Sequence, residues 1–504
     1  MVSAEYMTID DKLNQLKTLR GGTPENERIA TQHARGKLTS RERILLLLDP
    51  NTFQETDIDC NDAVIVGSGK IYGRTVFVFS QDFTVVGGTI SKTGGQKIGR
   101  IMDIALDQGA PIIGIYDSGG ARIHEGVASL AGVGEILLRN TRCSGAIPQI
   151  AVVVGPSAGG AAYSPSLCDF VFTVNNITQM YITGPDVVKS VTNETVSHKE
   201  LGGAEIHSHI SGVAHFLHDS EIICFQQVRR LLSFLPQNCY TPPPIVRTDD
   251  PPERCTDALS TIIPNNPNKP YDMHDVITAV VDDGDFMEVQ VSFACNIICG
   301  LARLAGNSVG IVAQQPSVLA GAIDIDASVK AARFVRFCDA FNIPLVSLVD
   351  VPGFMPGTDQ EHNGIIRHGA KLIYAYAEAT VPKLTVTTRK AYGGAYIAMG
   401  SHHLDGDINY AWPEAVISVM GAETAVDIVF RKMIATSPEP AEMHRELVDE
   451  FRTHFDNPLH ALKLGYLDAV IDPRQTRPML IQALETLRNK PQKALKKKHG
   501  NIPL

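Results

Sequence analysis

Apolar runs that end in an aspartate and a tight turn occur twice along the chain. The first is PIIGIYDSGGAR at residues 111–122, and the second is PLVSLVDVPGFM at residues 344–355. A short apolar run followed by glycine or proline is typical of a buried strand that ends in a turn. The two aspartates, Asp117 and Asp350, are 233 positions apart. The pattern predicts the same strand and turn in two places.

Two further pairs of segments repeat at nearly the same spacing. The longer pair is IPQIAVVVGPSAGGAAY at residues 147–163 and VPKLTVTTRKAYGGAYI at residues 381–397, with glycine pairs 234 positions apart. The weaker pair is MYITGPDVV and ISVMGAETAV, in which Gly184 and Gly421 are 237 positions apart. Three motifs in one order at one recurring spacing predict a duplication of one α/β unit.

A proline-rich segment separates the two copies. It is YTPPPIVRTDDPPER at residues 240–254, and such composition is typical of the boundary between two domains. We therefore expect an α/β fold with two similar lobes, at residues 1–248 and 249–504.

Composition and charge narrow the class of protein. With 44% hydrophobic and 20% charged residues among 504, the chain can bury large cores. No apolar run approaches the roughly 18 residues of a membrane span, and the first residues, MVSAEYMTIDDKL, are acidic where targeting peptides are basic. A net charge of -10 argues against nucleic acid as the main partner. We expect a soluble, cytoplasmic protein without membrane insertion, and a solvated basic tail at NKPQKALKKKHG.

The nine cysteines indicate neither a disulfide framework nor a metal site. Their number is odd, and no C-x-x-C pair occurs. Cys295 and Cys299 lie in the apolar segment FACNIICG, where packing is the expected role. A reducing compartment and no bound metal are therefore expected.

The segment GPSAG at residues 155–159 fits the G-x-S-x-G pattern of serine hydrolases, with Ser157 as candidate nucleophile. The second copy has Ala391 at that position, so the hydroxyl is not part of the repeat. The repeated residues are two glycines and an alanine, namely Gly159, Gly160 and Ala161 in the first copy and Gly393, Gly394 and Ala395 in the second.

The repeated glycines indicate a role for the backbone. Glycine after a strand lets the main chain approach a ligand closely, and the N–H groups at the start of a following helix favour negative charge. The turns after the aspartates can supply a further N–H group in each lobe; they comprise Ser118, Gly119, Gly120 and Ala121, and Val351, Pro352, Gly353 and Phe354. We expect one oxyanion-binding site per lobe. Close packing of helix on strand, which also favours glycine, is the alternative.

Longer motifs identify a family resemblance. They include HARGKLTSRERI, SQDFTVVGG, DSGGARIHEG, GPSAGGAAYSP, ITGPDVVKSVTNE, VDVPGFMPG, GIIRHGAKLIYAYAEATVPK, RKAYGGAYIAMG and KKHGNIP. Over almost its whole length the chain resembles the carboxyltransferase β subunits of biotin-dependent acyl-CoA carboxylases, together with the related transcarboxylase and methylmalonyl-CoA decarboxylase subunits.

The resemblance implies two crotonase-like domains, residues 1–248 on the acyl-CoA side and 249–504 on the biotin side. It implies a homohexamer whose active site forms between the N-terminal lobe of one subunit and the C-terminal lobe of another. The implied activity is transfer of a carboxyl group between carboxybiotin, on a separate carrier chain, and the α carbon of a short-chain acyl-CoA. The implied partners are a biotin carboxylase and a biotin carboxyl carrier.

The resemblance also assigns roles to residues. It implies backbone oxyanion holes at Gly159, Gly160 and Ala161 for the thioester oxygen and at Gly394 and Ala395 for the biotin ureido oxygen. It implies substrate binding by Gly119, Gly120, Ala121, Arg122, Ala158 and Ile397. It implies biotin binding by Gly353, Phe354, Tyr392 and Gly393. The α proton would go to the ureido nitrogen, so no side-chain base is expected.

Several positions depart from the family pattern. The segment near residues 56–66 is short where relatives carry a basic and aromatic insert, and Ser157 and His124 stand where many relatives have Cys and Gln. Ile397 stands where propionyl-CoA enzymes usually carry Asp, and an aliphatic residue also suits transcarboxylase and decarboxylase subunits, so this position leaves the acyl group open. The resemblance as a whole favours propionyl-CoA, with acetyl-CoA as a further substrate.

The chain lacks Met-Lys-Met, GxxxxGK[ST] and a four-cysteine zinc module, so biotin and ATP would come from partner chains. A decarboxylase or transcarboxylase subunit, a Ser157 hydrolase and a non-catalytic scaffold are the alternatives.

Overall fold

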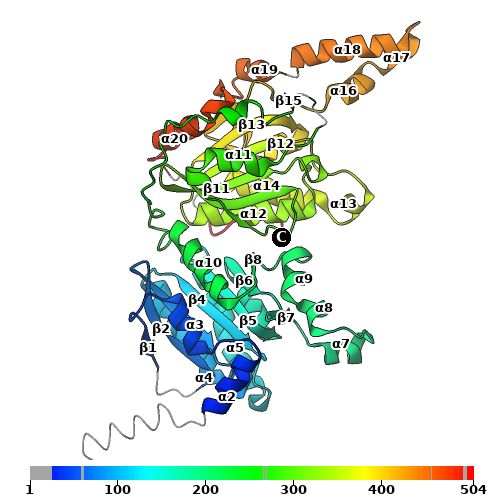
Figure 1. The fold of residues 1–504 in the computed structure, drawn as a ribbon. Helices are drawn as coiled ribbons and strands as arrows, with labels where there is room; N and C mark the ends of the chain where they lie inside the picture. Colours follow the sequence, from blue (N-terminus) through cyan, green and yellow to red (C-terminus); the bar gives the residue numbers. More distant parts are fainter. Residues whose placement is uncertain (1–24, 58–61, 265, 267–268, 456, 492–496) are drawn as a thin grey trace, which may run out of the picture. The chain divides into compact units, whose positions relative to one another are not determined.

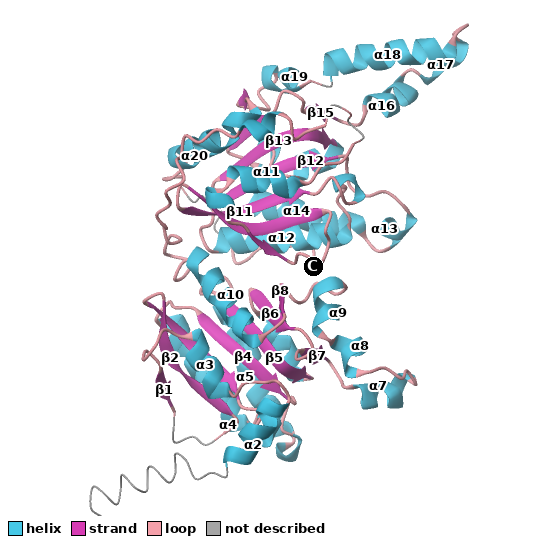
Figure 2. Ribbon diagram, in the orientation of Figure 1, coloured by secondary structure: helices cyan, strands magenta, loops and turns pink. Residues whose placement is uncertain are grey.

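The chain folds into two compact units, Met1–Thr241 and Pro242–Leu504. The structure, a computed structural model, describes residues 25–57, 62–264, 266, 269–455, 457–491 and 497–504 (Figure 1). The division falls inside the proline-rich segment that separates the two sequence copies. Each unit holds one eight-stranded sheet, with helices against it (Figure 2).

The first sheet begins with an antiparallel meander and continues with parallel strands. Its order is β1-β2-β3-β4-β5-β6-β8, with β7 paired to β5. The strands are β1 (Gln54–Thr56), β2 (Val64–Ile71), β3 (Arg74–Gln81), β4 (Ile112–Ser118), β5 (Gln149–Ala158), β6 (Phe170–Val174), β7 (Gln179–Tyr181) and β8 (Phe216–His218). Every residue of β4 is buried, as its continuous apolar run predicts for a central parallel strand.

Helices of the first unit cover its sheet and extend from it. They are α2 (Glu25–Ala34), α3 (Ser40–Leu47), α4 (Lys92–Asp107), α5 (Val127–Cys143), α6 (Gly160–Leu167), α7 (Pro185–Thr192), α8 (His198–Gly202), α9 (Ala204–His209) and α10 (Glu221–Phe234). Ile98, Ile101 and Met102 of α4 form a core with Phe79 and Ile112 of the sheet.

The second sheet repeats the first in the same chain order. Its path is β16-β14-β13-β12-β11-β10-β9, with β15 paired to β13. The strands are β9 (Met287–Val289), β10 (Ile297–Leu304), β11 (Asn307–Gln314), β12 (Leu345–Val351), β13 (Lys383–Tyr392), β14 (Ile408–Ala411), β15 (Val416–Ser418) and β16 (Ala469–Val470). The predicted α/β duplication is therefore confirmed.

The register of the central strands repeats as well. Ser118 of β4 pairs with Ser157 of β5 after a shift in register, and Val351 of β12 pairs with Ala391 of β13 after the same kind of shift. Because Ser157 and Ala391 occupy equivalent places, the sequence alignment of the two copies holds at the level of single residues.

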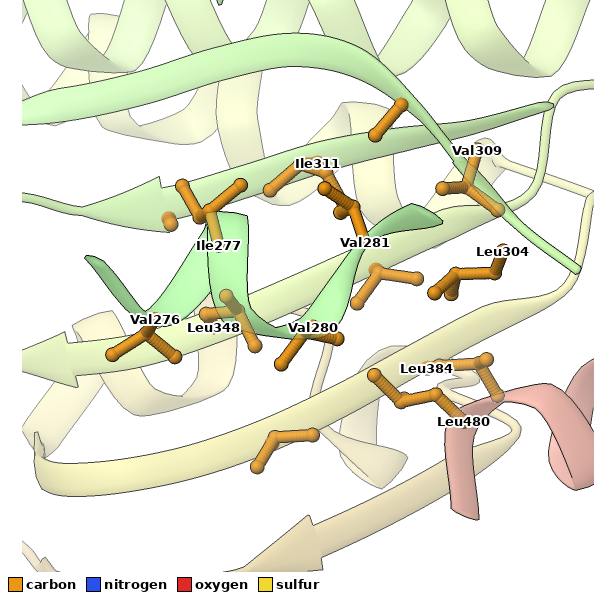
Figure 3. Packing of buried hydrophobic residues seen from close by; sticks show 14 of the residues in the cluster. Val276, Ile277, Val280, Val281, Leu304, Val309, Ile311, Leu348, Leu384 and Leu480 are labelled. Atoms are coloured by element: carbon orange, nitrogen blue, oxygen red, sulfur yellow. The ribbon is translucent and has the colours of Figure 1, made fainter. Parts of the chain in front are cut away.

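The second unit has a large aliphatic core. Its helices are α11 (Met273–Val280), α12 (Ile325–Ala340), α13 (Thr358–His362), α14 (Ile365–Glu378), α15 (Gly393–Ala398), α16 (Ala422–Val429), α17 (Arg431–Thr436), α18 (Pro440–Phe455), α19 (Pro458–Lys463) and α20 (Thr476–Thr486). Figure 3 shows core side chains of α11, the sheet and α20, among them Val276, Ile277, Val280, Ile311, Leu348, Leu384 and Leu480. Figure 1 shows α16, α17 and α18 extending away from this sheet.

Two short 3-10 helices, η1 (Val86–Gly88) and η5 (Leu319–Gly321), pack beside the turns that follow β4 and β12. The remaining ones are η2 (Ile123–Glu125), η3 (Asp257–Ser260), η4 (Asp282–Gly284), η6 (His402–Leu404) and η7 (Pro473–Gln475). None of the helices that the structure describes is long and apolar enough to cross a membrane.

The cysteines and the basic tail can be compared with expectation. Cys299 is buried, and burial raises the pKa of its thiol to about 12, in accord with a packing role. Cys295 is exposed, so it does not pack as expected. Part of the tail lies outside the described residues, but Lys490 pairs with Asp407 and Lys497 with Glu378. The expectation of a solvated tail is therefore wrong for Lys490, whose side chain is 14% exposed in its ion pair, but it agrees with Lys497, whose side chain is 46% exposed.

Candidate active site: two backbone turns

The first turn joins β5 to α6. Gly159 lies between them with φ +59°, a left-handed conformation that favours glycine. Its N–H donates to the Tyr181 carbonyl of β7 at 3.1 Å. Gly160 and Ala161 then open α6, and the described chain offers no acceptor for their N–H groups. Two donors of a helix start are thus left for a ligand.

The turn after β4 lies directly against this helix start. A Cβ added to Gly120, which has φ +99°, would lie 2.8 Å from the Ala158 carbonyl oxygen. The Gly120 N–H is already donated to Ser118 Oγ at 3.1 Å. By contrast, no acceptor for the Ala121 N–H occurs among the described residues. The donor that this turn can offer is therefore Ala121, and not Gly120. We call the N–H groups of Ala121, Gly160 and Ala161 the first hole.

The second lobe repeats the arrangement. Gly393 has φ +58°, close to that of Gly159, and Gly394 and Ala395 continue α15. Gly353 has φ +145°, and its carbonyl accepts from the Ile323 N–H at 3.0 Å. Phe354 follows, and in the part of the chain that the structure describes its N–H has no acceptor. We call the N–H groups of Phe354, Gly394 and Ala395 the second hole.

Ser157 is not available as a nucleophile. Its side chain is 0% exposed, and its hydroxyl donates to the Ala161 carbonyl at 3.0 Å. A nucleophile must reach its substrate, and this hydroxyl instead closes the first turn of α6. The serine hydrolase alternative is therefore not supported by the geometry.

Arg122, a predicted substrate-binding residue, has its charge paired within the protein. Its guanidinium contacts Asp62 Oδ1 at 2.5 Å, Glu125 Oε1 at 3.3 Å and the Thr89 carbonyl at 3.1 Å. Burial alone would raise the pKa of Asp62, but hydrogen bonds from Ser91, the Ala63 N–H and Arg122 lower it. Arg122 thus joins neighbouring loops, and it is not a free cation.

A large apolar pocket opens in front of the second hole. Its volume is about 770 Å³, and Gly393, Gly394 and Ile397 form one wall. The other walls come from β15, α16, α18, α19 and the residues that directly follow β15 and α19. They include Ile417, Val419, Ile428, Phe451, Phe455 and Leu464. A Cβ on Gly394 would meet only the edge of the Phe354 ring, at 3.9 Å, so the glycine keeps this wall open.

The lining of this pocket also carries polar aromatic groups. The Tyr396 hydroxyl is buried without a hydrogen-bond partner in the described chain, and burial raises its pKa to about 12. His403 lies edge-on to the rings of Tyr396 and Tyr466, with centroids 5.9 and 4.7 Å away. Sequence reasoning did not single out these residues: no motif pointed to a role for Tyr396 or His403, and Tyr466 lies 63 positions beyond His403. No group of His, Cys, Asp or Glu that could hold a metal ion occurs among the described residues.

The sequence analysis also did not predict the buried ion pairs of the two aspartates that precede the turns. Asp117 contacts Lys37 and Arg43, and Asp350 contacts Arg389. A signal existed, because each aspartate ends a repeated apolar run and the motif HARGKLTSRERI contains both cations of the first lobe. The spacing within the sequence gives no indication that they meet.

Comparisons with known proteins cover both units. The family model of the carboxyl transferase domain matches residues 31–502. A propionyl-CoA carboxylase carboxyltransferase subunit of Haloferax mediterranei is 53% identical over 99% of this chain and 100% of its own length. The methylmalonyl-CoA decarboxylase subunit alpha of Veillonella parvula is 50% identical over 99% and 100%.

Among solved structures, the transcarboxylase 12S hexamer with methylmalonyl-coenzyme A and methylmalonic acid bound is similar to this chain. The TM-score is 0.95 with 46% sequence identity, and each chain is covered completely. The fold expected from the sequence, a duplicated crotonase-like fold, is confirmed by this likeness.

Proposed function

Because the chain belongs to the carboxyl transferase domain family, we propose that it moves a carboxyl group between carboxybiotin on a separate carrier chain and the α carbon of a short-chain acyl-CoA. The favoured reaction is conversion of propionyl-CoA to methylmalonyl-CoA, or its reverse. The observation that carries the proposal is the duplication of a helix start whose N–H groups lack acceptors, since carboxyl transfer develops charge on two oxygens. Relatives that act on propionyl-CoA and methylmalonyl-CoA support the choice of substrate.

The first hole serves the thioester oxygen in this proposal. Charge develops on that oxygen as the α carbon becomes an enolate, and donors fixed in advance stabilise it without reorganisation. Gly159 and Gly120 hold the main chain so that the N–H groups of the first hole stay in place. The adjacent residues Gly119 and Ala158 shape the same wall of the site.

The second hole, with the pocket before it, serves biotin. Biotin, when bound, supplies the carboxyl group and a ureido oxygen that takes up charge as this group leaves. Apolar walls and backbone donors fit an uncharged bicyclic ring with one polar edge, which supports the assignment. Gly353 and Phe354 form one side of the site, and Tyr392 and Gly393 form the other.

The assembly and partners follow from the family. We propose a homohexamer in which the N-terminal lobe, residues 1–248, of one subunit faces the C-terminal lobe, residues 249–504, of another. A biotin carboxylase and a carrier chain deliver the carboxyl group. The cysteines that the structure describes are free, which favours a reducing compartment, and we propose the cytoplasm.

A direct assay tests the function. The purified chain is given methylmalonyl-CoA and free biotin, and propionyl-CoA is quantified by chromatography with and without biotin. We expect propionyl-CoA to form in a biotin-dependent manner. A folded hexamer that forms none would contradict the proposal.

A second candidate function is that of a decarboxylase or transcarboxylase subunit, which would use the same site with different partner chains. The relative of Veillonella parvula is a decarboxylase subunit, and the transcarboxylase is similar along its whole length. Purification of the native complex distinguishes the two: a biotin carboxylase chain supports the carboxylase, and a membrane-embedded subunit supports the decarboxylase.

A further inference from the structure

Two buried aspartates occupy the same place in the two lobes. Asp117 and Asp350 are the second-last residues of β4 and β12, and both are 0% exposed. The Asp117 N–H donates to Gln81 Oε1 at 3.1 Å, and the Asp350 N–H donates to Gln314 Oε1 at 3.2 Å. Gln81 and Gln314 end β3 and β11. The duplication therefore includes the aspartate and the group that holds its backbone.

The main chain of each aspartate leads directly into a hole. A Cβ on Gly88 would lie 2.1 Å from the Asp117 carbonyl oxygen, and one on Gly321 would lie 2.6 Å from that of Asp350. The junction between strand and turn is thus in close contact with η1 in the first lobe and with η5 in the second. Any displacement of the aspartate moves the turn that carries the Ala121 or Phe354 N–H.

The second lobe supplies its own cation to the aspartate. Arg389 Nε donates to Asp350 Oδ2 at 2.9 Å, and the Lys390 N–H donates to Oδ1 at 3.1 Å. The Arg389 guanidinium also lies over the Tyr271 ring, 4.9 Å from its centroid. Arg389 is four residues before Gly393 on β13, so this ion pair joins the two segments that form the second hole.

In the first lobe, an arginine at the equivalent position is sterically excluded. The position equivalent to Arg389 is Gly155, where a Cβ would lie 1.9 Å from Asp117 Oδ1. The cations come instead from the segment between α2 and β1. Lys37 Nζ donates to Asp117 Oδ1 at 2.7 Å, and Arg43 Nη1 donates to Oδ2 at 2.8 Å.

Arg43 extends this network to the rest of the lobe. Its Nε donates to Glu221 Oε2 of α10 at 2.6 Å, and its Nη2 donates to the Val154 carbonyl of β5 at 3.0 Å. With Lys37, two cations face two carboxylates, and all four side chains are buried. Removing one partner of such a group leaves a charge uncompensated, and the remaining side chains must rearrange.

We propose that Lys37 and Arg43 are positioning residues for the first hole, acting on Asp117 as Arg389 acts on Asp350. The inference rests on the proposed function, in which the first hole receives the thioester oxygen. Its consequence is that each hole depends on different cations, so a substitution can weaken the response to the CoA ester or the response to biotin separately.

The test compares Lys37→Met with Arg389→Met in the full hexamer. Equilibrium binding is measured for propionyl-CoA and for a CoA derivative that carries a nitronate in place of the enolate. We expect Lys37→Met to weaken nitronate binding at least about tenfold and propionyl-CoA binding less than about threefold, because the hole acts on developed charge. Arg389→Met should leave both affinities within about threefold and lower kcat for biotin-dependent transfer at least about tenfold.

Two further variants separate positioning from folding. Lys37→Arg, which keeps the charge, should restore nitronate binding to within about threefold of wild type. Lys383→Met removes another buried lysine, whose Nζ donates to the Tyr376 and Leu404 carbonyls at 2.9 and 3.2 Å. This control should leave the ratio of the two affinities unchanged.

If Lys37→Met leaves the ratio of the nitronate affinity to the propionyl-CoA affinity unchanged, whether both affinities fall equally or neither falls, the inference is overturned. If Lys37→Met does not fold, Gln32→Leu replaces it, since Gln32 Nε2 donates to Asp117 Oδ2 at 3.2 Å without charge. We then expect about a threefold loss in nitronate binding alone, and no loss would overturn the inference. A wild-type protein that binds neither ligand would overturn the proposed function, and the inference with it.

Discussion

Single residues determine which groups of the two turns can act. Gly159 and Gly393 have φ near +59° and +58°, and each directs the chain from a strand into a helix start. The residue two positions before each glycine, Ser157 or Ala391, is fully buried. Chemistry at these sites therefore depends on the main chain, and the side chains contribute packing.

Ser157→Ala tests this directly. We expect most carboxyl transfer to be retained, because Ala391 builds the equivalent turn without a hydroxyl. The lost hydrogen bond to the Ala161 carbonyl should cost about 1 kcal/mol of stability. Measurement of kcat/KM and of thermal unfolding checks both statements, and a loss beyond about 10²-fold in a folded protein would contradict them.

Ile397 should control the range of acyl groups. Ile397 lies on the wall of the biotin pocket with 39% of its surface exposed, and in the proposed assembly the first hole of another subunit brings the acyl group up to this wall. An apolar wall discriminates a methylene by only about 1 to 3 kcal/mol. We expect use of acetyl-, propionyl- and butyryl-CoA, with propionyl-CoA favoured by less than about 200-fold. Ile397→Asp should narrow the range toward propionyl-CoA, as the family resemblance suggests.

Comparison of kcat/KM for the three thioesters in the wild type and in Ile397→Asp tests whether Ile397 controls the range of acyl groups. Rejection of acetyl- and butyryl-CoA by more than about 10⁴-fold in the wild type would place specificity elsewhere. An unchanged profile in the variant would have the same meaning.

At the scale of elements, the two helix starts differ in how much bulk they tolerate. A Cβ on Gly160 would lie 2.8 Å from Val133 Cγ1, whereas a Cβ on Gly394 has only the Phe354 ring at 3.9 Å. Gly160→Val should therefore weaken the response to the CoA substrate and also lower stability by about 1 to 3 kcal/mol. Gly394→Val should weaken the response to biotin with a smaller change in stability.

Steady-state kinetics with each substrate varied in turn checks this separation, and thermal unfolding gives the difference in stability. Equal effects of both variants on both substrates would indicate general misfolding, and the assignment of the holes would fail.

A histidine joins α11 to β9 and makes stability depend on pH. The ring of His274 lies 2.8 Å from a carboxylate oxygen of Glu288 and 2.8 Å from one of Asp272. The hydrogen bond that the ring donates to Glu288, with the one that it donates to Asp272, raises the pKa of His274 to about 9. The folded pKa exceeds the unfolded one, so the stabilisation is complete below about pH 6.5 and is lost as pH rises through 9.

We expect the thermal midpoint of the wild type to fall about 1 to 2 °C more between pH 6.5 and 9.5 than that of His274→Gln, a small effect since the ring is partly exposed. Differential scanning calorimetry at the two pH values provides the measurement. Parallel changes in the two proteins would rule out a contribution from His274.

The elements that the sequence predicts are those specified locally. β4, β5 and their copies follow from apolar runs that end in glycine turns, and Gly159 and Gly393 follow from the repeat. The buried pairs of Asp117 and the pocket formed by Phe451, Phe455 and Leu464 could not be predicted, because their members meet only in the folded chain. Ser118 Oγ accepts the Gly120 N–H, so the free donor of this turn is the Ala121 N–H. The sequence pattern does not encode this contact.

At the scale of the whole molecule, each subunit carries one hole of each kind, in separate compact units. If the active site forms between subunits, Gly160→Val and Gly394→Val damage different halves of it. Hexamers that contain both variants would then regain intact sites, each formed from an undamaged first hole and an undamaged second hole.

Mixed hexamers, coexpressed with two affinity tags and purified by both, should recover about a quarter of wild-type activity at equal incorporation, since each half is intact with a chance of one in two. Hexamers of either variant alone serve as the baseline. Mixed hexamers no more active than this baseline would show that both halves belong to one subunit.

The distance along the sequence between the partners of each buried ion pair also determines when that ion pair can form during synthesis. Arg43 and Glu221 are 178 residues apart, whereas Asp350 and Arg389 are separated by 39. A ribosome extends the chain at roughly 5 to 20 residues per second, so Arg43 leaves the exit tunnel many seconds before its last partner. The first lobe must keep this arginine solvated while α10 is being made, but the second can close its ion pair almost as soon as β13 emerges.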